Sequence, residues 1–229
     1  MAKGLVHGVG VGPGDSDLIT LKAIRVIQAC PVIAVPGNVA TESLAYQIAL
    51  AAIPEVAAKK LVAMPSPMAH DPKLVAANHT KNARTLERYL DAGQDVAFLT
   101  LGDPSIYSTF GHLRRALEAD GYQTSAISGV PSFCAAAARL GLSLAEGDEP
   151  IHVLPANGIG GAESLDAVGT YVVMKAGTRM REVKAILGAA NLNARAIERC
   201  GMEGEMSYPS LESIPDDASY LTLVIARHR

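Results

Sequence analysis

The sequence predicts an α/β protein of two domains, with a mostly parallel sheet in the first and a more strand-rich, mixed sheet in the second. Short apolar runs alternate with amphipathic segments over the first two thirds of the chain, which is typical of parallel βαβ units. An acidic stretch at residues 145–150 then precedes a part with several apolar runs and one clear amphipathic helix. We therefore expect an N-terminal α/β domain at residues 1–147 and a C-terminal α/β domain at residues 148–229.

The spacing of apolar residues predicts the elements of the first domain. Leu5–Val11 forms a strand that runs into a glycine turn. Residues 17–29 form a helix, with its N-cap at Asp15, Ser16 or Asp17 and its end before Pro31. Further strands are expected at residues 31–35, 61–64, 95–101 and 122–127, and further helices at residues 41–52, 71–92, 107–120 and from Ser132 onward.

The second domain is expected to contain more strand than helix. One helix is expected, at residues 179–189. The apolar runs predict strands at residues 151–154, 170–174, 194–198 and 220–226.

Composition and charge restrict the class of protein. Of the 229 residues, 49% are hydrophobic and 19% are charged, which is enough apolar surface for a packed core and argues against disorder. The net charge of −3 lacks the basic excess that binding to nucleic-acid backbones requires. The N-terminus has no signal-peptide pattern, and no apolar run reaches the roughly 18 residues of a membrane span. We expect a soluble, cytoplasmic protein without a nucleic-acid or membrane partner.

The cysteines and histidines suggest neither a disulfide framework nor a metal site. Cys30, Cys134 and Cys200 are scattered, with no C-x-x-C pair, and are expected to be buried thiols in a reducing compartment. Cys134 follows Ser132 on an alanine-rich segment, where inert packing is favoured over a nucleophile. The six histidines show no ligand spacing, so no metal is expected.

A glycine-rich turn links the first strand to the first helix at residues 8–15. Counted from Gly8 or Gly10, the last glycine of G-x-G-x-x-G would fall on Pro13 or Asp15, so both registers fail. Asp15 also places negative charge where a phosphate would lie at a helix N-terminus. A tight turn that lets chain segments or a bulky ligand approach the backbone is favoured. A nucleotide-binding oxidoreductase is the alternative from a different class, and a noncatalytic binding protein of the same fold is a third.

A second segment, at residues 100–110, joins the end of a predicted central strand to polar side chains. Gly102 permits a close approach to the backbone, and Asp103 supplies an acceptor. Ligands of open α/β sheets gather at such strand ends. Capping of the next helix by Asp103 and Ser105 explains the same residues equally well.

A third segment, at residues 128–138, repeats this arrangement. A strand end and Gly129 lead into a helix of small side chains. The hydroxyl of Ser132 is either its N-cap or a ligand-binding group.

These three segments, in this order, resemble the tetrapyrrole methylase family, the S-adenosylmethionine-dependent enzymes of cobalamin and sirohaem synthesis. Residues 9–23 resemble the family's G-x-G-P-G-D followed by L-x-T-L-x-A, and residues 102–104 match its G-D-P. Residues 128–132 resemble its P-G-[IV]-[ST]-S segment, with Ser128 in place of the proline, while Ser16 departs from another usual proline. The resemblance covers nearly the whole chain. It implies a homodimer, an active-site trough between two domains, and S-adenosyl-L-methionine as the methyl donor.

Within the family, residues 106–110 resemble the branch that methylates C20 of precorrin-2 or of cobalt-factor II. The near alternatives are methylases of C2/C7, C11 or C17. The resemblance implies twelve cofactor-binding residues, Leu101, Gly102, Asp103, Ile106, Tyr107, Ser108, Ser132 and Phe133 on one side and Met174, Gly201, Leu221 and Thr222 from the second domain.

A methyl group on a sulfonium is already activated, so placing it in line with the acceptor carbon matters more than acid–base chemistry. One proton must still leave C20. Asp103 and Tyr107 are the candidate catalytic bases, and the alternative is that Asp103 only holds the cofactor while water or the substrate's carboxylates take the proton. Lys175 and Arg179 are the cations expected to bind those carboxylates.

Overall fold

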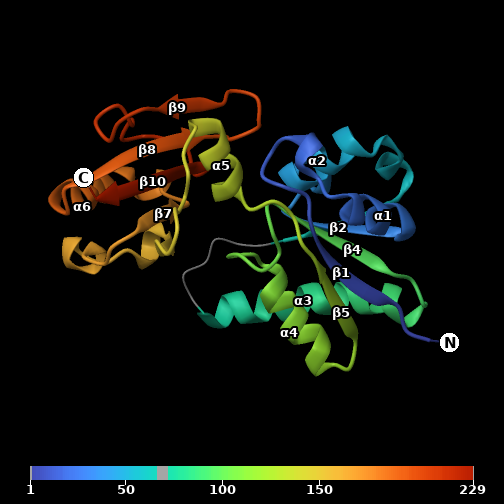
Figure 1. Ribbon diagram of the computed structural model, residues 1–229. Helices are drawn as coiled ribbons and strands as arrows, with labels where there is room; N and C mark the ends of the chain where they lie inside the picture. The colour runs from blue at the N-terminus through green and yellow to red at the C-terminus, as the bar shows by residue number, and fades with distance from the viewer. Residues whose placement is uncertain (1, 66–71, 229) are drawn as a thin grey trace. The chain divides into compact units, whose positions relative to one another are not determined.

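The computed structural model describes residues 2–65 and 72–228 and forms two compact units, Met1–Pro131 and Ser132–Arg229 (Figure 1). The units divide earlier than the expected boundary between residues 147 and 148. The helix α5 (Ser132–Leu140) belongs to the second unit because it contacts β8 (Leu192–Glu198) and β10 (Thr222–His228). Its small residues Ala135, Ala136 and Ala137 form its buried side.

The first unit contains a five-stranded sheet whose paired strands all run parallel, as predicted. The strand order is β3-β2-β4-β1-β5. In this sheet β1 lies between β4 and β5, with Gly10 opposite Thr100 and Val9 opposite Ile127, so the carboxyl ends of the three strands lie level. The strands are β1 (Leu5–Gly10), β2 (Val32–Pro36), β3 (Lys60–Met64), β4 (Val96–Thr100) and β5 (Gln123–Ile127).

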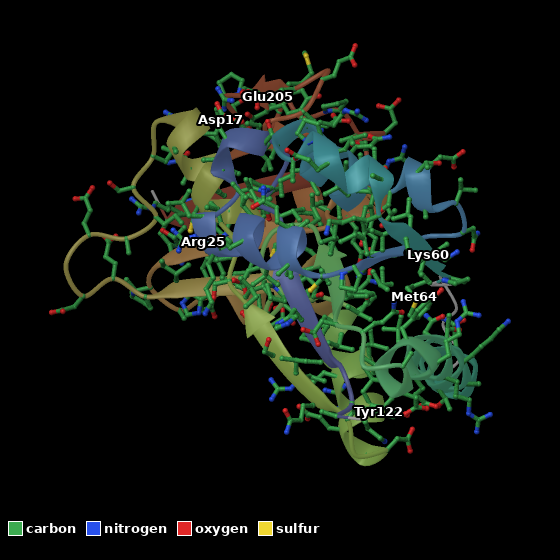
Figure 2. The ribbon with its side chains drawn as sticks, turned by 90° about the vertical axis from the view of Figure 1, so that its right-hand side faces the viewer. Asp17, Arg25, Lys60, Met64, Tyr122 and Glu205 are labelled. Atoms are coloured by element: carbon green, nitrogen blue, oxygen red, sulfur yellow. The ribbon has the colours of Figure 1, made fainter. Side chains whose placement is uncertain are left out.

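Helices cover both faces of this sheet, which is why its strands read as continuous apolar runs. On one face, α1 (Leu21–Ala29) and α2 (Leu44–Ala52) pack on the strands through residues such as Ile27. On the other face, α3 (Pro72–Asp91) and α4 (Phe110–Ala119) pack through residues such as Leu86. Figure 2 shows Arg25 on α1 and Tyr122 at the amino end of β5.

Three helices of the first unit begin three or four residues later than predicted, and one of them is α2, which was expected from residue 41 and begins at Leu44 after a 3₁₀ segment. The segment from residue 17 starts as a 3₁₀ turn, Ser16–Leu18, which Asp15 caps by accepting the N–H of Asp17. The α-helix then begins at Leu21, because the extended Thr20 accepts the N–H of Ala23 at 3.1 Å.

The helix expected from residue 107 begins only at Phe110. Tyr107 has φ of +46°, which no right-handed helix accommodates. Phe110 itself is buried, and its ring occupies the space that a side chain on Gly8 would take.

The second unit contains the predicted mixed sheet. Its strand order is β6-β7-β10-β8-β9, in which only β6 and β7 pair in parallel. The helix α6 (Met180–Ala189) packs Met180, Val183 and Leu187 on one face. The remaining strands are β6 (Ile151–Pro155), β7 (Thr170–Met174) and β9 (Met206–Tyr208), of which β9 was not predicted.

Short 3₁₀ segments complete the chain, and none was predicted as such. They lie at Ala40–Glu42, Pro54–Ala58, Ala156–Gly158, Ala162–Leu165 and Gly177–Arg179. Within the described ranges, no helix is long and apolar enough to cross a membrane.

Candidate functional site

Three loops meet at the carboxyl ends of β4, β1 and β5. Backbone hydrogen bonds join the first two loops: the N–H of Val11 donates to the carbonyl of Thr100 at 3.0 Å, and the N–H of Gly102 donates to the carbonyl of Gly12 at 2.7 Å. The hydroxyl of Thr20, at the start of α1, donates to the carbonyl of Ser128 at 3.3 Å. The strand ends at which the sequence predicted ligand binding are therefore adjacent in the first unit.

Three glycines allow these loops to approach so closely. A Cβ atom on Gly10 would lie 2.5 Å from the carbonyl oxygen of Gly102 and 2.8 Å from the Cα of Gly129. A Cβ on Gly129 would in turn meet the same carbonyl oxygen and lie 2.9 Å from the Cα of Gly10. Gly102 has φ of +71°, in the left-handed region that favours glycine. We call Gly10, Gly102 and Gly129 the glycine junction, which agrees with a close approach of chain segments at the first glycine turn.

Asp103 holds this junction together. Its side chain is 9% exposed. Oδ2 accepts the backbone N–H of Gly129 at 3.0 Å, and Oδ1 accepts the backbone N–H of Ser105 at 2.8 Å and the Ser105 hydroxyl. Both carboxylate oxygens therefore fix loop geometry. The capping interpretation of Asp103 and Ser105 is wrong, because the next helix begins only at Phe110, with Thr109 at its N-cap.

Tyr107 and Ser108 come next in the chain, and their environments differ. Tyr107 is 45% exposed in the left-handed conformation, which is costly for a bulky side chain. The Ser108 hydroxyl lies 2.9 Å from that of the buried Thr100 and accepts the N–H of Phe110 at 3.1 Å. Ser108 thus fixes the start of α4, while Tyr107 is partly exposed.

A hollow of about 540 Å³ in the first unit lies beside this loop. Pro104, Ser105, Tyr107 and Ser108 line one part of it, and residues of α4 line another. The hollow is of a size that small-molecule sites have. Two other predicted residues, Leu101 and Ile106, are half-buried in the same stretch of chain but do not line the hollow.

In the second unit, four predicted residues lie around one end of the mixed sheet. Met174 ends β7, and Thr222 begins β10 opposite Glu198, the last residue of β8. The carbonyl of Leu221 accepts the N–H of Arg199 at 3.3 Å. Gly201 follows with φ of +72°, and its N–H donates to Glu205, labelled in Figure 2, at 2.6 Å.

Thr222 offers an unpaired group at this end of the sheet. Its side chain is 1% exposed, and its hydroxyl oxygen has no hydrogen-bond partner within the part of the chain that the structure describes. A buried hydroxyl without a partner costs about 1–3 kcal/mol. The residues present therefore fit a ligand that supplies a polar atom here.

Ser132 and Phe133 open α5 and are both half-buried. Cys134, the third residue of this helix, was expected to be packed. Cys134 is exposed rather than packed, because the small residues after it form the buried side of the helix, whereas Cys30 and Cys200 are buried as expected. Among the side chains that the structure describes, no group of three or more His, Cys, Asp and Glu has metal-binding geometry; His70 and the side chain of His79 are not among them.

The two cations expected to bind substrate carboxylates differ in their surroundings. Arg179 is engaged within the protein: its guanidinium forms two contacts with the carboxylate of Glu182 and donates to the carbonyl of Ala156 at 3.0 Å. Lys175, directly after β7, has φ of +59°. Arg179 is therefore already paired within the protein.

Sequence reasoning did not foresee the contacts of four residues that shape these regions. The Thr20 hydroxyl joins two loops, and the Thr100 hydroxyl holds Ser108 within the connection from β4 to α4. Gly129 completes the glycine junction, and Glu198 orders the end of the second sheet. Thr20 lies three residues before Ala23, which is the spacing of an N-cap, so the sequence could have predicted this contact. The partners of the other three lie 8 to 26 residues away, and their pairing depends on the tertiary fold.

The sequence of this chain is similar to those of known methyltransferases. A probable cobalt-precorrin-2 C(20)-methyltransferase of Methanocaldococcus jannaschii is 32% identical over 226 residues, which cover 97% of this chain and 95% of that protein. A precorrin-4 C(11)-methyltransferase of Rhodococcus erythropolis is 40% identical over 139 residues, which cover 61% of this chain and 49% of that protein.

A solved structure shares the fold. The uroporphyrin-III C-methyltransferase of Thermus thermophilus, complexed with S-adenyl homocysteine, has a TM-score of 0.73 at 22% identity, and the match covers 98% of this chain and 97% of that one. The family model of the tetrapyrrole (corrin/porphyrin) methylases matches residues 5–215. Since this match spans most of the sequence and both units contribute to it, the chain belongs to the tetrapyrrole (corrin/porphyrin) methylases.

Proposed function

We propose that this protein transfers a methyl group from S-adenosyl-L-methionine to C20 of precorrin-2 or cobalt-factor II in cobalamin synthesis. The observation that carries the proposal is the 32% identity to a probable cobalt-precorrin-2 C(20)-methyltransferase along nearly the full length of both chains. C11 is the alternative site of methylation, because a relative named as a C(11)-methyltransferase also matches this chain. That match covers only 61% of the chain, so C20 is favoured.

We propose that the donor is bound by the twelve residues that the resemblance implies. In the first unit, the donor would lie on the loop from Leu101 to Ser108, where the glycine junction sets the backbone and the hollow beside Tyr107 offers space. In the second unit, the unpaired hydroxyl of Thr222 supports a polar ligand contact. Ser132, Phe133, Met174, Gly201 and Leu221 complete the proposed set.

The donor, when bound, supplies a methyl group activated by positive charge. The protein then has to orient it and remove water from the path to the acceptor carbon. Asp103 serves this orientation, because its carboxylate is committed to three donors on two loops. Tyr107 is the other candidate for the base that takes the C20 proton, because it lines the hollow beside this loop.

The remaining parts of the proposal concern assembly and compartment. We propose a homodimer, as the family resemblance implies, and a cytoplasmic location. Free thiols at Cys30, Cys134 and Cys200 support a reducing compartment. The molar mass in solution, by light scattering, tests the dimer.

The test of the function has two steps. Calorimetry is expected to show binding of S-adenosylhomocysteine and no binding of NAD or NADP, and the reverse result would favour the oxidoreductase alternative. Mass spectrometry after incubation with metal-free or cobalt-bound acceptor is then expected to show one added methyl group, which a noncatalytic binder could not add. Carbon labelling places that methyl at C20 if the proposal holds and at C11 if the alternative holds.

A further inference from the structure

A short segment of the second unit, Ser219–Thr222, leads into β10 and contains two of the proposed donor-binding residues, Leu221 and Thr222. Backbone hydrogen bonds fix it to the loop after β7 and close a turn within it. The N–H of Ala176 donates to the carbonyl of Thr222 at 3.2 Å, and the N–H of Thr222 donates to the carbonyl of Ser219 at 3.0 Å. The position of this segment therefore decides where the two binding residues lie.

Gly177 shows how closely the segment packs on the loop after β7. A Cβ atom on Gly177 would overlap the carbonyl of Ser219 and lie 2.5 Å from that of Ala218. Both neighbours are backbone atoms that cannot rotate away. The segment has little freedom to shift on this side.

Glu198 fixes the segment from the other side. Its Oε1 accepts the backbone N–H of Ser219 at 3.1 Å, and its Oε2 accepts the hydroxyl of Tyr208, on β9, at 3.0 Å. Glu198 also lies opposite Thr222 in the β8–β10 ladder. One carboxylate thus joins the end of β8, β9 and the start of β10.

The carboxylate is stabilised in its charged form. Burial by itself would raise the pKa of Glu198, but hydrogen bonds from Ser219 and Tyr208 and the charge of Arg199 outweigh burial and hold the pKa below its ordinary value. A partly buried charge is costly unless its oxygens are paired, and both oxygens of Glu198 are.

We propose that Glu198 is a positioning residue for the methyl donor, which it serves by holding Ser219–Thr222 in the conformation that binds it. This inference rests on the proposed function. Tyr208 acts through Glu198, because its hydroxyl orients the second carboxylate oxygen. Glu198 itself needs no contact with the donor or the acceptor.

Four variants test the proposal by calorimetric titration with S-adenosylhomocysteine. Glu198→Ala leaves the N–H of Ser219 without its acceptor and is expected to weaken binding about tenfold. Glu198→Gln is expected to restore most of the affinity, because the amide oxygen still accepts from Ser219 while the amide N–H donates to the Tyr208 hydroxyl. Tyr208→Phe is expected to weaken binding about threefold. The binding free energy lost is smaller than that of a full hydrogen bond to a charged group, because Tyr208 acts only through Glu198. Glu203→Ala, an exposed carboxylate between β8 and β9, is the matched control and is expected to bind like the unchanged protein.

The kinetics separate positioning from loss of folded protein. For Glu198→Ala, KM for the donor is expected to rise while kcat at saturating donor stays within about twofold of the unchanged protein, because only binding is impaired. The double variant Glu198→Ala with Tyr208→Phe is expected to bind no worse than Glu198→Ala alone. If Glu198→Ala unfolds, Tyr208→Phe and Glu198→Gln still carry the test.

The outcomes remain distinguishable from failure of the proposed function. Unchanged protein that binds no S-adenosylhomocysteine refutes the proposed function. The positioning role is refuted if the unchanged protein binds S-adenosylhomocysteine and Glu198→Ala or Tyr208→Phe binds it with equal affinity. A fall in kcat with unchanged KM also refutes it.

Discussion

The carboxylate of Asp103 accepts the backbone N–H of Gly129 at 3.0 Å, and this hydrogen bond joins the loops after β4 and β5 across the intervening β1. Because β1 lies between the two strands, its Gly10 has to fit beneath that connection without a side chain. The G-D-P motif therefore has two structural roles in the first unit. Its glycine permits the contact of the loops, and its aspartate holds them.

Asp103→Asn tests this holding role. An asparagine has one acceptor oxygen where the structure needs two, so either orientation of the amide points an N–H at a backbone N–H. We expect a loss of about 1–3 kcal/mol in the free energy of unfolding, measured by urea denaturation. Donor affinity is expected to fall with it. If Asp103 instead acts as the base, kcat falls while the affinity for S-adenosylhomocysteine stays unchanged.

The glycine junction makes a sharper prediction because the chain offers a matched control. Gly10→Ala places a Cβ against two backbone segments, and we expect a loss of about 1–3 kcal/mol or more in the free energy of unfolding. Gly111→Ala adds the same methyl group within α4, where no atom lies within 4 Å of it. This control is expected to gain up to about 1 kcal/mol, because alanine favours the helix. Equal effects of the two changes would show that the junction is not tightly packed.

The sequence predicted the order of the parallel elements well, since each strand and helix carries its own apolar pattern. It predicted helix starts less well, because Thr20 and Tyr107 act through backbone conformation, which apolar spacing does not report. β9 was missed because its exposed Met206 and Ser207 show no apolar run. The contact of Asp103 with Gly129 lay beyond sequence reasoning, since 26 residues and the intervening β1 separate its partners.

Tyr107 carries backbone strain that a glycine would relieve. Tyr107→Gly is expected to leave the free energy of unfolding unchanged or to raise it by about 1 kcal/mol, because φ of +46° suits glycine. Methyl transfer is expected to fall, since the phenol that is a candidate base is lost. Tyr107→Phe removes the hydroxyl alone and separates the two effects. Full activity of Tyr107→Phe would exclude Tyr107 as the base.

The three thiols are expected to differ in reactivity with a disulfide reagent at pH 8. Burial, with the charge of Asp95 adding to it, raises the pKa of Cys30 to about 12 despite the nearby Lys59, so its thiolate is scarce. Cys200 is buried. We expect one thiol, Cys134, to react in the folded protein, and more slowly than a free thiol, because partial burial raises its pKa. Cys134→Ser is expected to abolish this reaction, and all three thiols are expected to react in urea.

The lowered pKa of Glu198 predicts an acid-sensitive contribution to stability. Burial opposes the shift, but the hydrogen bonds from Ser219 and Tyr208 and the charge of Arg199 prevail, so the folded state holds the charged form below the ordinary value of 4.5. A group with a depressed folded pKa contributes stability that is present above its unfolded pKa and is lost as pH falls through its folded pKa. The unfolding temperature of Glu198→Gln is therefore expected to lie below that of the unchanged protein at pH 7, and the difference is expected to shrink as pH falls below 4.5. Glu203→Gln, an exposed carboxylate, is the control and is expected to follow the unchanged protein at every pH. A difference for Glu198→Gln that stays constant from pH 7 to pH 3 would contradict the assignment of this stability to the charged carboxylate.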